Sequence, residues 1–175
     1  SAVNEAPSLV AVYGRIYDPS SLGALATFKL NAMGTAIVAA LFVWLVIRHT
    51  RTDEEAGRLE LVGSGRLGRA APLAAALLLA VGTAVLLGVL TALGLMAGGM
   101  PAAGSWAFGL MWAGTGVAFA ALAGVIAQLT TSHRAALAIG FGAIAGSYLV
   151  RALADLPAAG PTLWVWFSPL GWGSQ

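Results

Sequence analysis

The segment APLAAALLLAVGTAVLLGVLTALGLM, residues 71–96, decides the fold of this chain. It contains no charged side chain, and neither Asp, Glu, Lys, Arg nor His occurs anywhere from Ala70 to Ser132. At about 1.5 Å per residue, a helix of this length exceeds the roughly 30 Å hydrocarbon core of a bilayer. The segment therefore predicts a helix that crosses a membrane.

The composition of the whole chain agrees with this prediction. Hydrophobic residues make up 59% of the 175 residues and charged residues 9%, whereas about 25% are charged in soluble domains. The chain has no Cys, which excludes disulfides and thiolate metal sites, and its two histidines, His49 and His133, lie far apart in the sequence. We expect an all-α integral membrane protein with no metal site, no catalytic residue and no nucleic-acid partner.

Hydropathy places four spans along the chain, joined by short polar or glycine-rich segments. The predicted spans are residues 25–47, 71–96, 105–129 and 135–153. Arginines gather beside two connections, 48–70 and 130–134, and by the positive-inside rule both should face the cytoplasm across the plasma (inner) membrane. Residues 1–24 and 154–175 should then lie outside. The tryptophans expected in an aromatic belt at the outer interface are Trp106, Trp112, Trp164, Trp166 and Trp172.

Small residues recur at four-residue spacing in the spans. The pairs and triplets are Gly94/Gly98, Gly116/Ala120/Gly124 and Gly142/Gly146. Such faces allow close helix packing in lipid. They also arise by chance in a chain rich in Ala and Gly, so both interpretations stay open.

The cytoplasmic connection RHTRTDEEAGRLELVGSGRLGR, residues 48–69, carries most of the charge of the chain. Thr52 followed three residues later by Glu55 predicts a capping box that starts a helix of about ten residues, ended by Gly63-Ser64-Gly65. Glu54 and Arg58 are spaced to form an ion pair on that helix. The pattern is typical either of a docking element at the membrane surface or of an ordinary solvated loop.

The residues of this connection carry a family resemblance. Glu54-Glu55-Ala56-Gly57-Arg58-Leu59-Glu60-Leu61-Val62 followed by Gly65-Arg66-Leu67-Gly68-Arg69 resembles the coupling-helix signature of ABC-2 type exporter permeases. The chain is most similar to the actinobacterial permeases that export polyketide antibiotics and other drugs. Further matching stretches are Val12-Tyr13-Gly14, Asp18-Pro19-Ser20-Ser21-Leu22-Gly23, Arg48-His49-Thr50-Arg51, Ala71-Pro72-Leu73-Ala74-Ala75-Ala76, Ala127-Gln128-Leu129-Thr130 and Ser168-Pro169-Leu170-Gly171-Trp172. The chain departs from the family pattern at Gly63-Ser64.

The resemblance implies a type V exporter-like permease that moves hydrophobic or amphiphilic compounds out of the cell. One family span would precede Ser1, and further spans would follow Gln175. ATP and Mg would be bound by separate nucleotide-binding (ATPase) subunits, two of them, and the permease itself would have no cofactor. The residues expected to contact that partner are Glu54, Glu55, Gly57, Arg58, Leu59, Glu60 and Leu61. An external re-entrant gate is implied at Ser168, Pro169, Leu170 and Trp172.

Two other functions are compatible with a membrane protein of this composition. An ion-coupled secondary transporter usually needs an ionisable group within the membrane, and the spans 71–96 and 105–129 have none. A scaffold that recruits a soluble partner through residues 48–69 would share the docking element but move no substrate.

Overall fold

The computed structural model describes residues 22–57, 68 and 70–154. These residues form long helices, and none of them lies in a strand. The elements are α2 (Leu22–Ile47), η1 (Arg48–Thr52), α3 (Asp53–Glu55), α5 (Ala71–Ala97), α6 (Ala102–Leu129) and α7 (His133–Ala154). Within the described part, four helices are long and apolar enough to cross a membrane, which confirms the all-α membrane fold.

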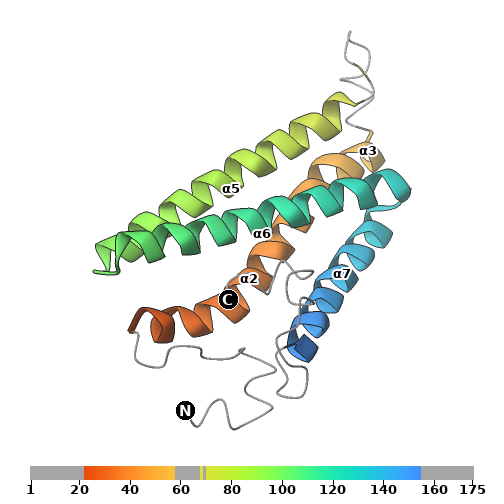
Figure 1. Ribbon diagram of the computed structural model, residues 1–175. Coiled ribbons are helices and arrows are strands. Elements are labelled where there is room, and N and C mark those ends of the chain that lie inside the picture. Colours follow the sequence, from red (N-terminus) through yellow and green to blue (C-terminus); the bar gives the residue numbers. More distant parts are fainter. Residues whose placement is uncertain (1–21, 58–67, 69, 155–175) are drawn as a thin grey trace.

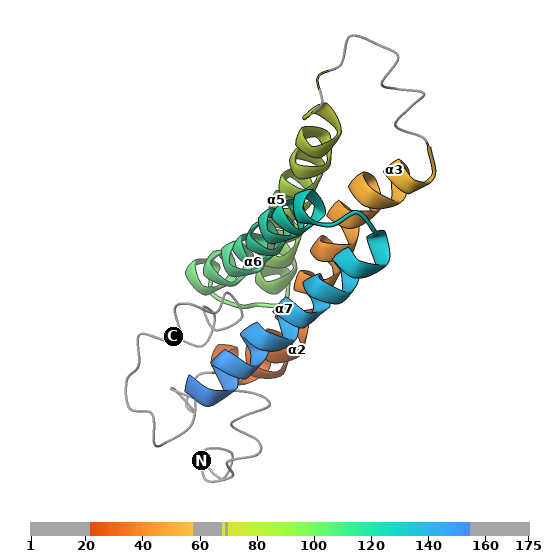
Figure 2. The same cartoon turned by 90° about the vertical axis from the view of Figure 1, so that its right-hand side faces the viewer.

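The four helices run up and down as neighbours (Figure 1). α6 packs along α5 on one side and along α2 on the other, and α7 packs mainly on α2. Figure 2 shows α7 crossing in front of α2 while α5 and α6 lie together beside them. α2 and α6 therefore form the centre of the bundle.

The core lies where α2 meets α6. Phe42, Val43 and Val46 of α2 are almost fully buried, as is Phe119 of α6. Gly116 of α6 lies against the ring of Phe42, so a Cβ there would come within 2.8 Å of that ring. Small residues on one helix thus receive the large side chains of the other.

α5 and α6 approach each other more closely, at a stripe of small residues. The buried residues of α5 are spaced four apart: Ala76, Ala80, Ala84, Gly88 and Ala92. Gly88 meets Gly109 of α6, where an added Cβ on Gly88 would lie 2.8 Å from the carbonyl oxygen of Gly109. Backbone contact of this kind is typical of helices in lipid, where packing rather than water exclusion drives association.

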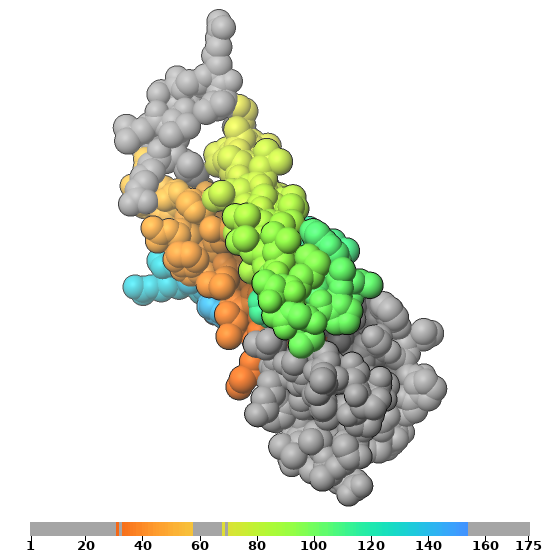
Figure 3. Space-filling view, turned by 90° about the vertical axis from the view of Figure 1, so that its left-hand side faces the viewer, coloured from red at the N-terminus to blue at the C-terminus, as the bar shows by residue number. Residues whose placement is uncertain are grey.

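The opposite face of α5 consists of large apolar side chains that face outward. Leu78, Val85, Leu86 and Leu90 are all more than half exposed. Figure 3 shows α5 running along the outside of the bundle, beside α2. A helix with small residues inside and large apolar residues outside is suited to a lipid solvent.

The small-residue patterns noticed in the sequence have different outcomes. Gly116, Ala120 and Gly124 are buried in α6, against α2 and α5. Gly142 and Gly146 of α7 are exposed, with open space where a Cβ would point. Spacing alone therefore does not identify the helix contacts, and the α5 stripe that makes the closest one was not among the predicted patterns.

Trp112 does not occupy the outer interface that the sequence predicted for it. It lies within α6, its ring packs onto Gly34 of α2, and it tilts against Phe108 at a centroid distance of 5.4 Å. Because Gly34 has no side chain, it leaves room for the indole between the two helices. Trp106, one helical turn into α6, is 42% exposed, as an interfacial residue would be.

The α5–α6 contact predicts a large effect from one methyl group. Gly109→Ala should destabilise the protein by about 1–3 kcal/mol, because the new Cβ would collide with the carbonyl of Gly88 and separate the helices. The matched control is Gly82→Ala on α5, where nothing lies within 4 Å and only the better helix propensity of Ala is felt. Thermal unfolding in detergent measures both variants. Equal stability of the two would contradict the close contact.

Candidate functional site

Charged side chains gather at one end of the bundle. The end of α2 with η1 and α3, the end of α6 and the start of α7 all meet there (Figures 1 and 2). At the opposite end, the turn between α5 and α6 is Gly98-Gly99-Met100-Pro101, without a charge. The structure thus brings residues 48–57, the first part of one connection that the sequence assigned to this side of the membrane, next to the other connection, 130–134.

α2 continues into the charged segment without a break. It passes through the π turn η1 into α3, and Thr52 has helical dihedral angles of φ −68° and ψ −39° with no side-chain cap. The prediction that Thr52 begins a new helix is therefore wrong. A helix-capping residue needs a non-helical backbone, which the preceding turns of α2 do not allow here.

The helix ends soon after Glu55. Gly57 adopts a left-handed conformation, φ +70°, and its N–H donates to the carbonyl of Glu54 at 3.0 Å. A glycine in this conformation is a common helix stop because it has no Cβ to clash. Gly57 thus ends this helix well before Gly63, and the residues from Arg58 to Leu67 lie outside the described part of the chain.

Glu55 joins this segment to the start of α7. One carboxylate oxygen accepts the backbone N–H of His133 at 2.7 Å, and the other contacts Nδ1 of the same histidine. His133 is the first residue of α7, where a helix leaves its N–H groups without partners of its own. Glu55 therefore caps α7 from a segment 78 positions away in the sequence.

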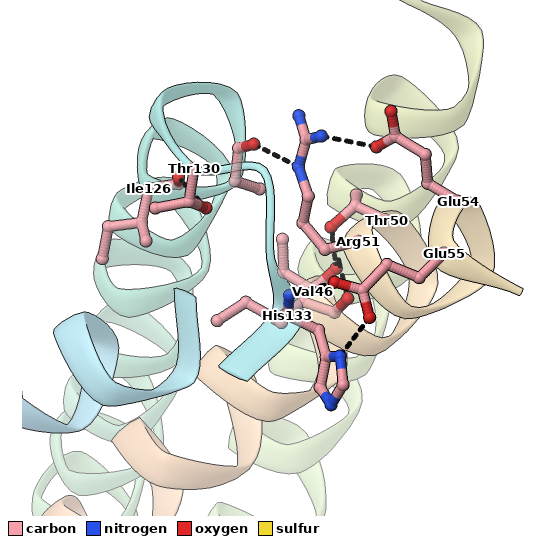
Figure 4. Close-up of polar contacts among 10 residues, drawn as sticks. Val46, Thr50, Arg51, Glu54, Glu55, Ile126, Thr130 and His133 are labelled. Atoms are coloured by element: carbon pink, nitrogen blue, oxygen red, sulfur yellow. Dashed lines mark hydrogen bonds and ion pairs between the residues drawn. The ribbon is translucent and has the colours of Figure 1, made fainter. Parts of the chain in front are cut away.

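Arg51 joins the same segment to the end of α6. Its Nε donates to the carbonyl oxygen of Ala127, in the last turn of α6, and Nη1 pairs with Glu54 at 2.6 Å. The arginine side chain is only 16% exposed. Figure 4 shows Arg51 lying between Glu54 and the α6 backbone, with Glu55 pointing to His133.

These two contacts match the electrostatics of the helix ends. The carboxylate of Glu55 lies at the positive N-terminus of α7, and the guanidinium of Arg51 lies at the negative C-terminus of α6. The hydrogen bonds from His133, first of all from its backbone N–H, and the positive charge of Arg134 lower the pKa of Glu55. Glu55 is thus ionised at neutral pH, and its stabilising contribution is lost only when the pH falls through the lowered pKa.

Two local contacts support the same end of α2. Thr50 is buried and donates its hydroxyl to the carbonyl of Val46 at 2.7 Å, next to the π turn. Arg48 stacks over the ring of Trp44, 5.2 Å from its centroid, where Trp44 is exposed on the outer face of α2. Both contacts join residues four positions apart and support the helical geometry from α2 into η1.

The predicted partner-binding residues divide into two groups. Glu54, Glu55 and Gly57 are described, and the carboxylates of both glutamates are engaged within the chain. Glu54 pairs with Arg51, and the expected pair of Glu54 with Arg58 lies outside the described residues. Outside the described residues lie Arg58, Leu59, Glu60, Leu61, Ser168, Pro169, Leu170 and Trp172.

Sequence reasoning missed Arg51 and His133 as members of this site. Neither was expected to contact another span, because local sequence patterns do not reveal contacts between residues 76 and 78 positions apart. In the described ranges, no group of three or more His, Cys, Asp or Glu residues could hold a metal ion.

A sequence relative connects this architecture to known proteins. Over all 175 residues the chain is 42% identical to the multidrug efflux system permease protein Rv1217c of Mycobacterium tuberculosis. The chain is a relative of a bacterial multidrug efflux permease. No family model matches the chain.

The resemblance to export permeases that the sequence predicted is thereby confirmed. The match runs through the whole chain but covers 31% of the length of the mycobacterial permease. The described part of the chain thus gives the arrangement of four spans and one charged end, in a segment related to one portion of an efflux permease.

Proposed function

We propose that this chain is part of the transmembrane permease of an ATP-driven exporter, and that residues 48–69 dock onto a separate ATPase subunit. The single observation that carries the proposal is the construction of the charged end. A segment that continues from α2 is tied by Arg51 to α6 and by Glu55 to α7. A partner that moves this segment therefore acts on three spans at once.

The charge distribution supports an orientation with this end in the cytoplasm. Positive residues gather at the charged end, and the α5–α6 turn has none. An ATPase that uses cytoplasmic ATP would meet the permease at that end. We place the protein in the plasma (inner) membrane, with ATP and Mg on the partner subunits, two of them, and no cofactor on this chain.

The substrate class is inferred from the bundle and from the relative. α5 and α6 contain no charged residue, and the mycobacterial protein is a multidrug efflux permease. An uncharged helix pair suits hydrophobic or amphiphilic compounds, such as antibiotics and other drugs. The same absence of ionisable groups disfavours ion coupling through these two helices.

A scaffold without transport is the alternative from another functional class. It would use the same tied segment for docking and would move no compound. The similarity to an efflux permease favours transport over this alternative.

The first prediction concerns orientation. The chain has no Cys of its own, so single cysteines report access cleanly. Ser105 is 1% exposed and unsuitable, whereas Ala103 and Thr131 are exposed at opposite ends of α6. On intact cells an impermeant maleimide should label Ala103→Cys and leave Thr131→Cys and Ser64→Cys unlabelled until the cells are opened. Equal labelling of all three would contradict the orientation.

The second prediction concerns docking. If Leu59 packs into a cleft of the ATPase subunit, Leu59→Asp places an unpaired charge in a desolvated contact, at a cost of roughly 3–5 kcal/mol. The variant should reach the membrane in normal amount, yet fail to retain the ATPase subunit in pull-down and fail to export ethidium.

The control for this prediction is Leu67→Asp, the same change outside the predicted contact residues. It should retain the ATPase subunit and export ethidium as the unmodified protein does. Normal efflux by Leu59→Asp would contradict docking through this residue. Retained binding without any ATP-dependent efflux, in the unmodified protein as well, would favour the scaffold.

A further inference from the structure

The helix that leaves the charged end, α7, is held to the bundle by a narrow contact. Ala136, Gly140 and Ile144 are buried at four-residue spacing, and Gly140 lies against Val43 and Ile47 of α2. Of the described residues of α7, Arg151 is the only other buried one. Leu137 and Tyr148 are partly buried against the same core, so α7 contacts the other described helices along one face.

The start of α7 is held differently. There Glu55 accepts the first backbone N–H of the helix and contacts the imidazole of His133. The backbone contact has a direction, because the first N–H groups of a helix point out of its N-terminus. A displacement of Glu55 therefore pulls on the end of α7 rather than sliding past it.

Arg51 gives the same segment a hold on α6. The Nε–H group meets a carbonyl in the last turn of that helix, and the pair with Glu54 keeps the guanidinium in place. α6 in turn is in backbone contact with α5 through Gly88 and Gly109. Arg51 thus connects the segment to the α5–α6 pair, and Glu55 connects it to α7.

We propose that Arg51 and Glu55 are positioning residues that transmit movement of the docking segment to α6 and α7, and that they do not contact the ATPase subunit. This inference rests on the proposed function. It reassigns Glu55 from partner binding to a contact within the chain. The two residues act as a pair: Arg51 anchors the segment to α6, and Glu55 moves the start of α7.

The test separates transmission from docking in the complete complex of permease and ATPase subunit. Glu55→Ala removes the cap of α7, and Arg51→Ala removes the hold on α6. Each variant should retain the ATPase subunit in normal amount and keep basal ATP hydrolysis within about twofold. Ethidium efflux should fall about tenfold or more, the factor expected for loss of a hydrogen bond to a charged group.

A covalent replacement provides the positive arm. In the double variant Glu55→Cys/His133→Cys, efflux should be low as for Glu55→Ala, and a short bismaleimide linker between the two thiols should restore most of it. The matched control is Thr131→Cys, which places one thiol at an exposed position of the same turn. It should export ethidium at the normal rate before and after treatment with the linker.

Three outcomes would overturn the inference. Normal efflux by Glu55→Ala would show that the cap transmits nothing, and loss of the ATPase subunit from that variant would make Glu55 a docking residue. Linked double-Cys protein that stays inactive would show that the 55–133 connection is not the contact whose loss stops efflux. If Glu55→Ala fails to fold, Glu55→Gln replaces it, because Gln keeps the shape of the side chain. Normal efflux by a Glu55→Gln protein of normal thermal stability would then overturn the inference.

Failure of the proposed function and failure of the transmission role would give different experimental results. If the protein is not an ATP-driven exporter, ethidium efflux by the unmodified complex does not depend on ATP, whatever Arg51 and Glu55 do. If only the transmission role is wrong, the unmodified complex exports in an ATP-dependent manner and the variants do so equally well.

Discussion

The structure depends on one constraint, which is that a bilayer interior offers no water to the peptide backbone. Each span must satisfy its N–H and C=O groups by its own helical hydrogen bonds, and only the helix ends are left over. At the charged end of this bundle two of those ends, the close of α6 and the start of α7, receive side-chain partners from a third helix. The polar site is therefore made from the backbone groups that the membrane leaves unsatisfied.

The same constraint decides how the spans pack. Lipid is as apolar as the side chains, so association relies on close contact, and α5 and α6 achieve it through Gly88, Gly109 and a stripe of alanines. α2 and α6 use the other solution, in which the ring of Phe42 fills the space above Gly116. In α7, Gly142 and Gly146 take part in neither kind of contact, because they face away from the other described helices. Among the described helices, α5 and α6 are thus the most closely joined pair.

Much of this fold could be predicted from the sequence, because length and hydropathy are local properties. The uninterrupted apolar run of residues 71–96 corresponds to α5, Ala71–Ala97, almost residue for residue. Contacts between helices could not be predicted in this way. Trp112 looks like an interfacial residue until Gly34, on another helix, is seen to provide its pocket.

The charged site shows the same limit. The residue types of 48–57 predict a helix and a polar surface, and both are present. The capping box predicted from Thr52 and Glu55 is nevertheless wrong. A local motif of this kind competes with the helix that already precedes it and with partners far along the chain. α2 arrives at Thr52 already helical, and Glu55 is drawn to the unpaired N–H of His133 instead of to its own backbone.

The π turn η1 lies between α2 and Glu55, which contacts α7, so its winding sets how Glu55 is rotated about the helix axis. In the π turn of residues 48–52 the hydrogen bonds span five positions instead of the four of an α-helix, and π turns of this kind are frequent at functional sites. If that turn tightened to α geometry, every residue beyond it would rotate by roughly 100° about the helix axis, since an α-helix has 3.6 residues per turn. Glu55 would then swing away from α7 while the spans themselves stayed in register. A change of winding in a single turn would thereby disconnect the docking segment from α7.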